Sequence, residues 1–220
     1  MLEEKMTNLK KNIIEFAGLV ENMLDRSMKG LAQKDKDLLN EVINNMEPKT
    51  NHLDLVIEEM CINIIAQYAP KGKELRIIIM AIEMNKDLER AGDHIVNIAQ
   101  SGLYLIERPL LKQFIDLLKM SEITKQMFSD SINSFVNEDT QLAKNVCEKD
   151  CLLDNLCKSI LKESILLVKN DSSAIERILH SIRISHNLER ISDISTNICE
   201  NVIYSTTCKV IKHHNIQNNK

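Results

Sequence analysis

The sequence predicts an all-α protein built as two tandem, pseudo-symmetric three-helix bundles with six long helices. Of the 220 residues only 3% are aromatic, Trp is absent, and there are 5 Gly and 3 Pro. Helices that pack through aliphatic side chains need few aromatic or turn residues, whereas strand-rich domains use more of both. An internal repeat is the second observation, because DLERAGDHIVNIA begins at Asp87 and NLERISDISTNIC begins at Asn187. Such self-similarity is typical of a duplicated supersecondary unit.

The first half is expected to contain three helices separated by short breaks. Pro70 and Gly72 lie in the stretch YAPKGK, where proline and glycine together end one helix and allow a turn before the next. The following stretch LRIIIMAI, residues 75–82, is apolar on all sides of a helix, which requires cover from the other half or from a second copy of the chain. A homodimer is therefore one of the two readings. The expected helices are 3–33, 36–68 and 73–107.

The second half begins at the break made by Pro109, beyond which the chain has no further Gly or Pro. Its helices must be separated by polar clusters, where Asp139 and either Ser172 or Ser173 are suitable N-caps. We expect domains at 1–108 and 109–220. The expected helices of the second half are 110–137, 139–169 and 172–211.

Bulk properties exclude several classes of protein. The net charge of −4 offers no basic field for nucleic acid. No apolar run approaches the ~20 residues that span a bilayer, and the charged N-terminus lacks the apolar core of a signal peptide, so we expect a cytoplasmic protein. The six cysteines show no CxxC spacing and are expected to be reduced, although Cys147 and Cys151 could share a metal ion at i,i+4.

Acidic residues recur on one face of each motif helix. Residues four apart share a face of an α-helix, so Glu89 and Asp93 form one acidic pair and Glu189 and Asp193 form another. Both pairs lie opposite the apolar stripe of their helix, which predicts an outward-facing ridge. Each middle helix carries a related element. These elements are Glu47 with Asn51, and Asp150 with Asp154.

Two readings of this acidic ridge are open. The first is a solvated surface on which Arg90 pairs with Asp93 and Arg190 pairs with Asp193. The second is a metal site, because clustered carboxylates repel each other unless a multivalent cation lies between them. Iron, manganese, magnesium and zinc all suit oxygen ligands of this kind. Repetition of the spacing on two helices of each half favours the metal site.

The second half has the more complete ligand set, namely Asp150, Asp154, Glu189 and Asp193. In the first half Asn51 takes the place of an acid, and Pro48 within the same turn predicts a kink or a late helix start. The first-half site, with Glu47, Glu89 and Asp93, is therefore expected to hold fewer ions.

An enzyme is disfavoured by the same residues. Di-metal oxidases in helical bundles place Glu-x-x-His motifs toward the bundle interior, and no histidine here has Glu three residues before it. The chain also has no GxxxxGK[ST] phosphate loop and no GxSxG elbow. DNA binding is disfavoured by the charge and by the lack of a basic recognition helix.

The repeated motif, with the middle-helix elements at 47–51 and 150–154, resembles the PhoU family of bacterial phosphate regulators. The resemblance covers about residues 5–214. It implies two similar three-helix bundles that bind iron or zinc, with manganese or magnesium as alternatives, in clusters that can be multinuclear. The implied ligands come from E(D)xxxD pairs. They map to Glu89, Asp93, Asp150, Asp154, Glu189, Asp193 and, less completely, Glu47.

The resemblance also implies a role. A PhoU-like protein dampens phosphate-starvation signalling, and with it transcription of phosphate genes, when phosphate is plentiful. Its implied partners are the ATPase of a phosphate ABC transporter and a membrane sensor histidine kinase, so membrane association would be peripheral. The alternative is a helical accessory module of a different phosphate or cation transporter, in which the acids are a docking surface and hold no functional metal.

Overall fold

The structure, a computed structural model, describes residues 1–109, 111 and 114–207 and contains no strand among them. This confirms the predicted all-α class. The predicted start of a helix at residue 110 and the predicted end at 211 lie outside the described residues. The elements are α1 (Leu2–Gln33), α2 (Lys36–Glu41), the π-helical turn η1 (Val42–Met46), α3 (Glu47–Tyr68), α4 (Lys73–Ile106), α5 (Phe114–Asn137), α6 (Thr140–Asn170), the 3₁₀ turn η2 (Ser172–Ala174) and α7 (Ile175–Thr207).

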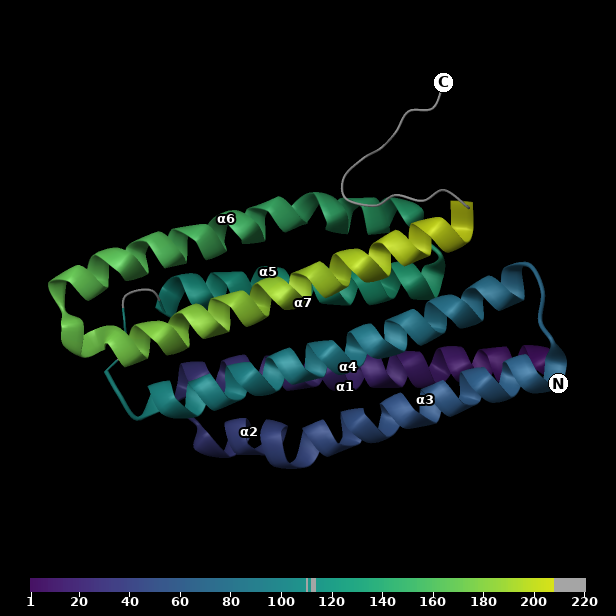
Figure 1. Cartoon of the computed structure of the whole chain (residues 1–220), viewed down its shortest axis with the longest axis horizontal. Helices are drawn as coiled ribbons and strands as arrows, with labels where there is room; N and C mark the ends of the chain where they lie inside the picture. The colour runs from purple at the N-terminus through teal and green to yellow at the C-terminus, as the bar shows by residue number, and fades with distance from the viewer. Residues whose placement is uncertain (110, 112–113, 208–220) are drawn as a thin grey trace, which may run out of the picture.

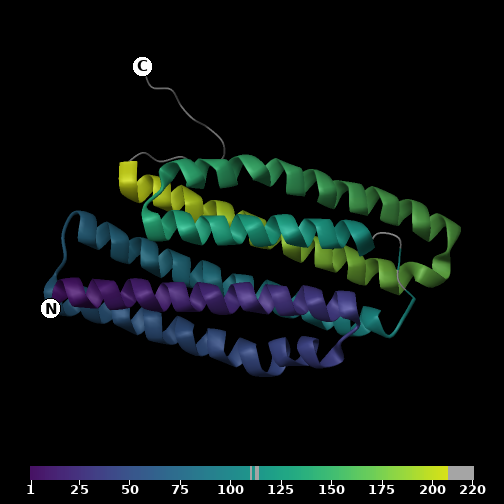
Figure 2. The same cartoon turned by 180° about the vertical axis from the view of Figure 1, so that it is seen from behind.

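The helices form two three-helix bundles that lie side by side (Figure 1). The first bundle contains α1, α4 and a rod made of α2, η1 and α3, and the second contains α5, α6 and α7. With that rod counted once, the predicted six long helices are confirmed. The bundles meet where α4 packs on α7 and α1 packs on α5. Seen from behind, α1 and α5 lie in front of α4 and α7 (Figure 2).

The rod from α2 to α3 is interrupted just before Pro48. In a regular α-helix the proline ring would clash with the carbonyl of residue 44, and no N–H would be available to bond it. The backbone widens here into the π-helical turn η1, and α3 starts at Glu47 with proline in its first turn. The predicted effect of Pro48, a kink or a late helix start, is therefore present as a π turn followed by a new α-helix.

Two aspartates cap helices of the second bundle. The predicted N-cap Asp139 is confirmed, because its carboxylate accepts hydrogen bonds from the backbone N–H groups of Gln141 and Leu142 at 2.9 and 3.0 Å. The predicted caps Ser172 and Ser173 are wrong. Asp171 accepts from the Ser173 N–H and caps the 3₁₀ turn that leads into α7, so the helical chain begins at residue 172 as expected but starts with a 3₁₀ turn, and the α-helix follows at Ile175.

Helices α4 and α7 share a plan of burial with a spacing of a hundred residues. Ile78 and Ile178 are buried, as are Leu88 and Leu188, and the same correspondence extends to Ile98 and Ile198 in the list of core residues. The apolar stripe of each helix faces its own bundle and the neighbouring one. The repeat in the sequence is thus a repeat in packing as well.

The apolar stretch at 75–82 lies beside the second bundle on one side. Ile77 and Met80 line a hollow together with Phe135 of α5 and Ser205 of α7. Ile79 on another side of the helix stays 47% exposed. Among the described residues, none of the helices combines the length and the apolar character that a membrane span requires.

Candidate metal centre

Four carboxylates of the second bundle gather between α6 and α7. Asp150 and Asp154 lie one turn apart on α6, and Glu189 and Asp193 lie one turn apart on α7. All four are half-buried, so the ridge is less open to solvent than its spacing alone predicts. The Ser192 hydroxyl donates to Asp150 Oδ1 at 3.1 Å and joins the two helices at this point. We refer to Asp150, Asp154, Glu189 and Asp193 as the carboxylate quartet.

Asp193 is electrostatically influenced by the other three members of the quartet. Burial raises the pKa of Asp193 to about 6, and the negative charge of Asp150 adds to this rise. Arg190 opposes the rise with an Nη1 to Oδ2 distance of 3.6 Å, and the charges of the other two quartet members raise the pKa further. Burial and neighbouring negative charges disfavour the ionised form of Asp193, and a cation placed among the four carboxylates would stabilise that form.

The first bundle contains a smaller acidic cluster. Burial raises the pKa of Glu89, and the negative charges of Asp93 and Asp54 contribute to the rise. Asp54 of α3 was not among the predicted ligands. Its own pKa is raised by burial and by Glu58, and it accepts a hydrogen bond from Asn85 Nδ2 at 2.6 Å. Asp54 therefore lies near enough to Glu89 for its charge to act on that carboxyl, as the charge of Asp93 does.

The register that relates the two bundles explains why the first acidic cluster has fewer carboxylates than the second. Asp150 lies opposite Ser192, and a hundred residues earlier Thr50 lies opposite Gly92, where a Cβ on the glycine would be 3.5 Å from the threonine Oγ1. By this register Asp54 corresponds to Asp154 and Thr50 replaces Asp150. The first bundle then offers three carboxylates where the second offers four.

The predicted ligand Glu47 lies at the first residue of α3, nearly two turns before Asp54. It is half-buried. Its participation stays a prediction. The sequence pattern pairs Glu47 with Asp150, which is three residues out of the register that Thr50 and Gly92 define.

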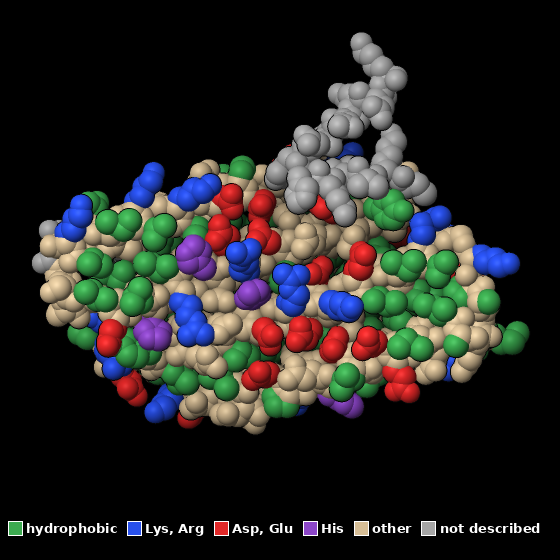
Figure 3. Space-filling model, in the orientation of Figure 1, with side chains coloured by type: hydrophobic (Ala, Val, Ile, Leu, Met, Phe, Trp, Pro, Cys, Tyr) green, Lys and Arg blue, Asp and Glu red, His purple; other side chains and the backbone are tan. Residues whose placement is uncertain are grey.

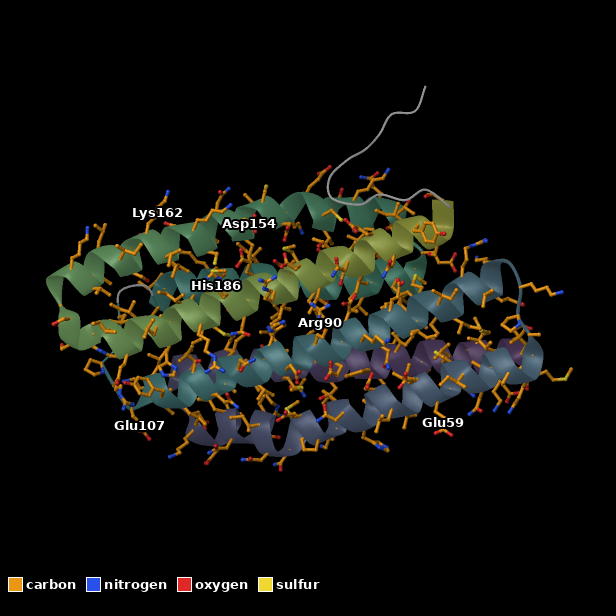
Figure 4. All side chains as sticks on the ribbon, viewed as in Figure 1. Glu59, Arg90, Glu107, Asp154, Lys162 and His186 are labelled. Atoms are coloured by element: carbon orange, nitrogen blue, oxygen red, sulfur yellow. The ribbon has the colours of Figure 1, made fainter. Side chains whose placement is uncertain are left out.

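A basic band separates the two acidic groups. Figure 3 shows acidic side chains gathered over α3 and α4 and again over α6 and α7, with Lys, Arg and His side chains between them. Figure 4 places Arg90 between α4 and α7. His94 lies in the same band, where its Nδ1 donates to Asn187 Oδ1 at 2.9 Å, and burial, together with Arg90 and Arg190, lowers its pKa. Positively charged side chains therefore lie between the two acidic clusters.

The chemistry of the quartet fits a hard or borderline cation. Half-buried carboxylates that crowd one another supply the oxygen ligands that iron, manganese, magnesium and zinc accept. The pairs Lys158–Asp154 at 3.7 Å and Arg190–Asp193 at 3.6 Å are long and exposed, so they hold the acids weakly. Both basic side chains can swing away when a multivalent ion binds.

Comparison with known proteins decides the family. The family model of the PhoU domain matches residues 13–102 and 117–202, which is most of the chain and includes both copies of the repeated motif. The chain belongs to the PhoU domain family. A PhoU homolog of Aquifex aeolicus is 35% identical over 216 residues, which are 98% of this chain and 97% of that protein. A PhoU homolog of Thermotoga maritima is 32% identical over 211 residues, covering 96% of this chain and 90% of the relative.

Solved PhoU structures share the fold over nearly the whole length. The crystal structure of PhoU from Pseudomonas aeruginosa superimposes with a TM-score of 0.92 at 27% identity and covers 95% of this chain and 100% of that one. PhoU from Streptococcus pneumoniae, described as a phosphate transport system regulatory protein, gives a TM-score of 0.89 at 27% identity with coverages of 97% and 100%. The duplicated bundle is therefore the PhoU architecture.

Proposed function

We propose that this chain is a non-enzymatic regulator of phosphate homeostasis that binds metal ions through its carboxylate quartet. Its relatives are named phosphate-specific transport system accessory proteins, which supports a role beside a phosphate transporter. The observation that carries the metal-binding part is that the charges of Asp150, Asp154 and Glu189 all act on Asp193, on two helices that the Ser192–Asp150 hydrogen bond joins. The smaller cluster of Asp54, Glu89 and Asp93 is a second, weaker site, and Glu47 remains a candidate ligand there.

The partners we propose are the ATPase of a phosphate ABC transporter and a membrane sensor histidine kinase, met in the cytoplasm. Two bundles, at 1–108 and 109–220, would present one long helical surface to them. An adaptor changes signalling only if it binds one conformation of its partner more tightly than another. We propose that bound metal stiffens the face between α6 and α7 and so selects the partner state that keeps phosphate genes quiet.

The test is a complementation experiment in a strain that lacks the protein. In phosphate-rich medium the strain should express its phosphate-uptake genes at a raised level, and the wild-type chain should restore repression. A chain with Asp150→Asn and Asp193→Asn should restore it less well at equal protein abundance, because the quartet has lost two ligands while the volume of each side chain is kept. Lys144→Gln on an exposed part of α6 serves as the matched control.

Two results would count against the proposal. Unchanged expression in the deletion strain would remove the regulatory role. Full repression by the quartet variant would remove the metal from the mechanism and leave a docking surface, for which the ion pairs Lys158–Asp154 and Arg190–Asp193 are the structural support.

A further inference from the structure

A sulfur, a nitrogen and an oxygen donor meet beside the quartet. Cys157 lies on α6, while His186 and Glu189 lie three residues apart on α7. Sγ of Cys157 is 3.4 Å from Glu189 Oε2 and 3.7 Å from His186 Nδ1, and that nitrogen is 3.1 Å from the same Oε2. Figure 4 shows His186 on α7 beside Asp154, which precedes Cys157 by nearly one turn of α6. Among the described residues this is a closed triangle of three different metal-ligating atoms.

The triangle has the size of one face of a tetrahedral zinc site. Bonds of about 2.3 Å to sulfur and about 2.0–2.1 Å to nitrogen and oxygen place tetrahedral ligand atoms about 3.3–3.6 Å apart. The three observed separations depart from that range by about 0.2 Å or less. One ion could therefore contact all three atoms after small side-chain rotations.

The surroundings leave one side of the triangle open. Cys157 is 4% exposed, whereas the His186 side chain is 52% exposed, so an ion held here would have protein below it and solvent above. The Ser185 hydroxyl lies 3.9 Å from the sulfur and donates to the Ile182 carbonyl, which fixes its position at the base of the site. A water molecule would complete four-coordination on the outer side.

The first bundle is an internal control for this site. By the register that relates Thr50 to Asp150, the residues of the first bundle that are equivalent to Cys157 and His186 are Ile57 and Lys86. Glu89 is equivalent to Glu189. Only the carboxylate is shared, so the duplicated plan of the two bundles does not by itself produce the triad.

We propose that Cys157, His186 and Glu189 bind one Zn²⁺ or a chemically similar divalent ion. This goes beyond the proposed function, which needs only the oxygen ligands of the quartet. Thiolate and imidazole select borderline-soft metals, so the two neighbouring sites would differ in the ion they prefer. Glu189 belongs to both sites, and its two carboxylate oxygens can serve one ion each.

Cobalt titration of the full, metal-free chain tests the proposal. Co²⁺ should give tetrahedral d–d bands and a near-ultraviolet charge-transfer band from thiolate to metal, saturating at about one ion per chain, and Zn²⁺ should remove these bands. Cys157→Ser should abolish the charge-transfer band. His186→Gln, at an exposed position that keeps the fold, should weaken Co²⁺ binding by at least about tenfold.

Two controls separate this site from other thiols and from the quartet. Cys151→Ser removes an exposed thiol of the same helix and should leave the bands unchanged. The Asp150→Asn, Asp193→Asn chain should also keep them, whatever the complementation experiment shows. The proposal is overturned if the wild-type chain gives no thiolate band, if the band survives in Cys157→Ser or is lost in Cys151→Ser, or if His186→Gln binds Co²⁺ as tightly as wild type. Loss of the band in the quartet variant would overturn the claim of a separate site.

Discussion

Asp87 and Asn187 occupy equivalent positions in the two bundles. They show how a buried carboxyl group and a buried amide differ in the stability they give to a helix interface. Both are buried. Asn187 accepts from His94 and donates to the Arg183 carbonyl, so its polar atoms are satisfied without charge. Burial raises the pKa of Asp87 to about 6 despite the Arg90 guanidinium at 3.2 Å. The second bundle thus uses a neutral amide where the first carries a carboxylate.

Asp87→Asn should stabilise the protein at pH 7. A group whose pKa is higher in the folded state than in the unfolded state favours folding below its unfolded pKa, near 4, and that contribution is lost as the pH rises through 6. Replacing the buried charge should therefore raise the free energy of unfolding by roughly 2 kcal/mol at pH 7, and by less as the pH falls toward 4. Urea unfolding at several pH values measures this, and a gain that is independent of pH would contradict the assignment.

At the level of single residues, the sequence places the carboxylates of the motif helices on one helix face, and it says less about which residues of other helices lie near them. The quartet follows from i,i+4 spacing on two helices. Asp54 was missed because the register of α3 against α4 depends on the length of the connector around Pro70, which periodicity does not determine. Cys157 and His186 were missed for another reason, since they lie on different helices and form no local pattern.

The two glycines of α1 differ in whether the packing of the bundle leaves room for a side chain. Gly30 lies where a Cβ would come within 2.8 Å of Leu39 Cγ and 3.0 Å of the Asp35 carbonyl, so the turn into α2 depends on the missing side chain. Gly18 in the same helix is exposed and has no atom within 4 Å of such a Cβ. One glycine is required by packing and the other is not.

Alanine substitutions at these two glycines should have opposite effects. Gly30→Ala should lower the free energy of unfolding by about 1–3 kcal/mol because Leu39 and the backbone at Asp35 must move. Gly18→Ala, the matched control, should raise it by about 0.5–1 kcal/mol through helix propensity. Chemical denaturation of both variants measures these changes in the free energy of unfolding. Equal effects of the same sign would show that the contact with Leu39 does not constrain the turn.

Helix boundaries were predictable where a chemical signal stands in the sequence. Asp139 caps α6 as its position indicates. Pro48 interrupts the regular α-helix between α2 and α3, as expected of a proline inside a helix. The π-helical form of that disturbance was not predictable, because it depends on how α2 and α3 each pack on the neighbouring helices. The capping residue before α7 was misplaced by one or two positions, since Asp, Ser and Ser follow one another and each is a competent cap.

For the whole molecule, the contact between α4 and α7 joins the bundles into one unit. Arg183 donates to Asn97 Oδ1 at 2.5 Å, and His94 bonds Asn187. At the far end the rings of Tyr104 and His180 stack with centroids 4.1 Å apart. Because these contacts lie beside a shared apolar surface, neither bundle can expose its motif helix without uncovering the other.

The two bundles should therefore unfold together. Hydrogen exchange in increasing denaturant should show α4 and α7 losing protection in a single cooperative transition. The comparison of the amides around Leu88 with those around Leu188 is the sharpest readout, since the two sites occupy equivalent positions. Loss of protection in one bundle at clearly lower denaturant would show that the interface is weaker than its contacts indicate.

The central claim is that a duplicated three-helix unit gathers carboxylates between neighbouring helices so that they hold cations. Elemental analysis of protein purified without chelator or nickel resin tests it most directly. We expect bound iron, zinc or manganese in the wild-type chain, a marked loss in the Asp150→Asn, Asp193→Asn variant, and a smaller loss when Asp54 and Glu89 are changed to Asn and Gln. Wild-type protein that carries no metal and takes up none on reconstitution, or a quartet variant with undiminished metal content, would contradict the account.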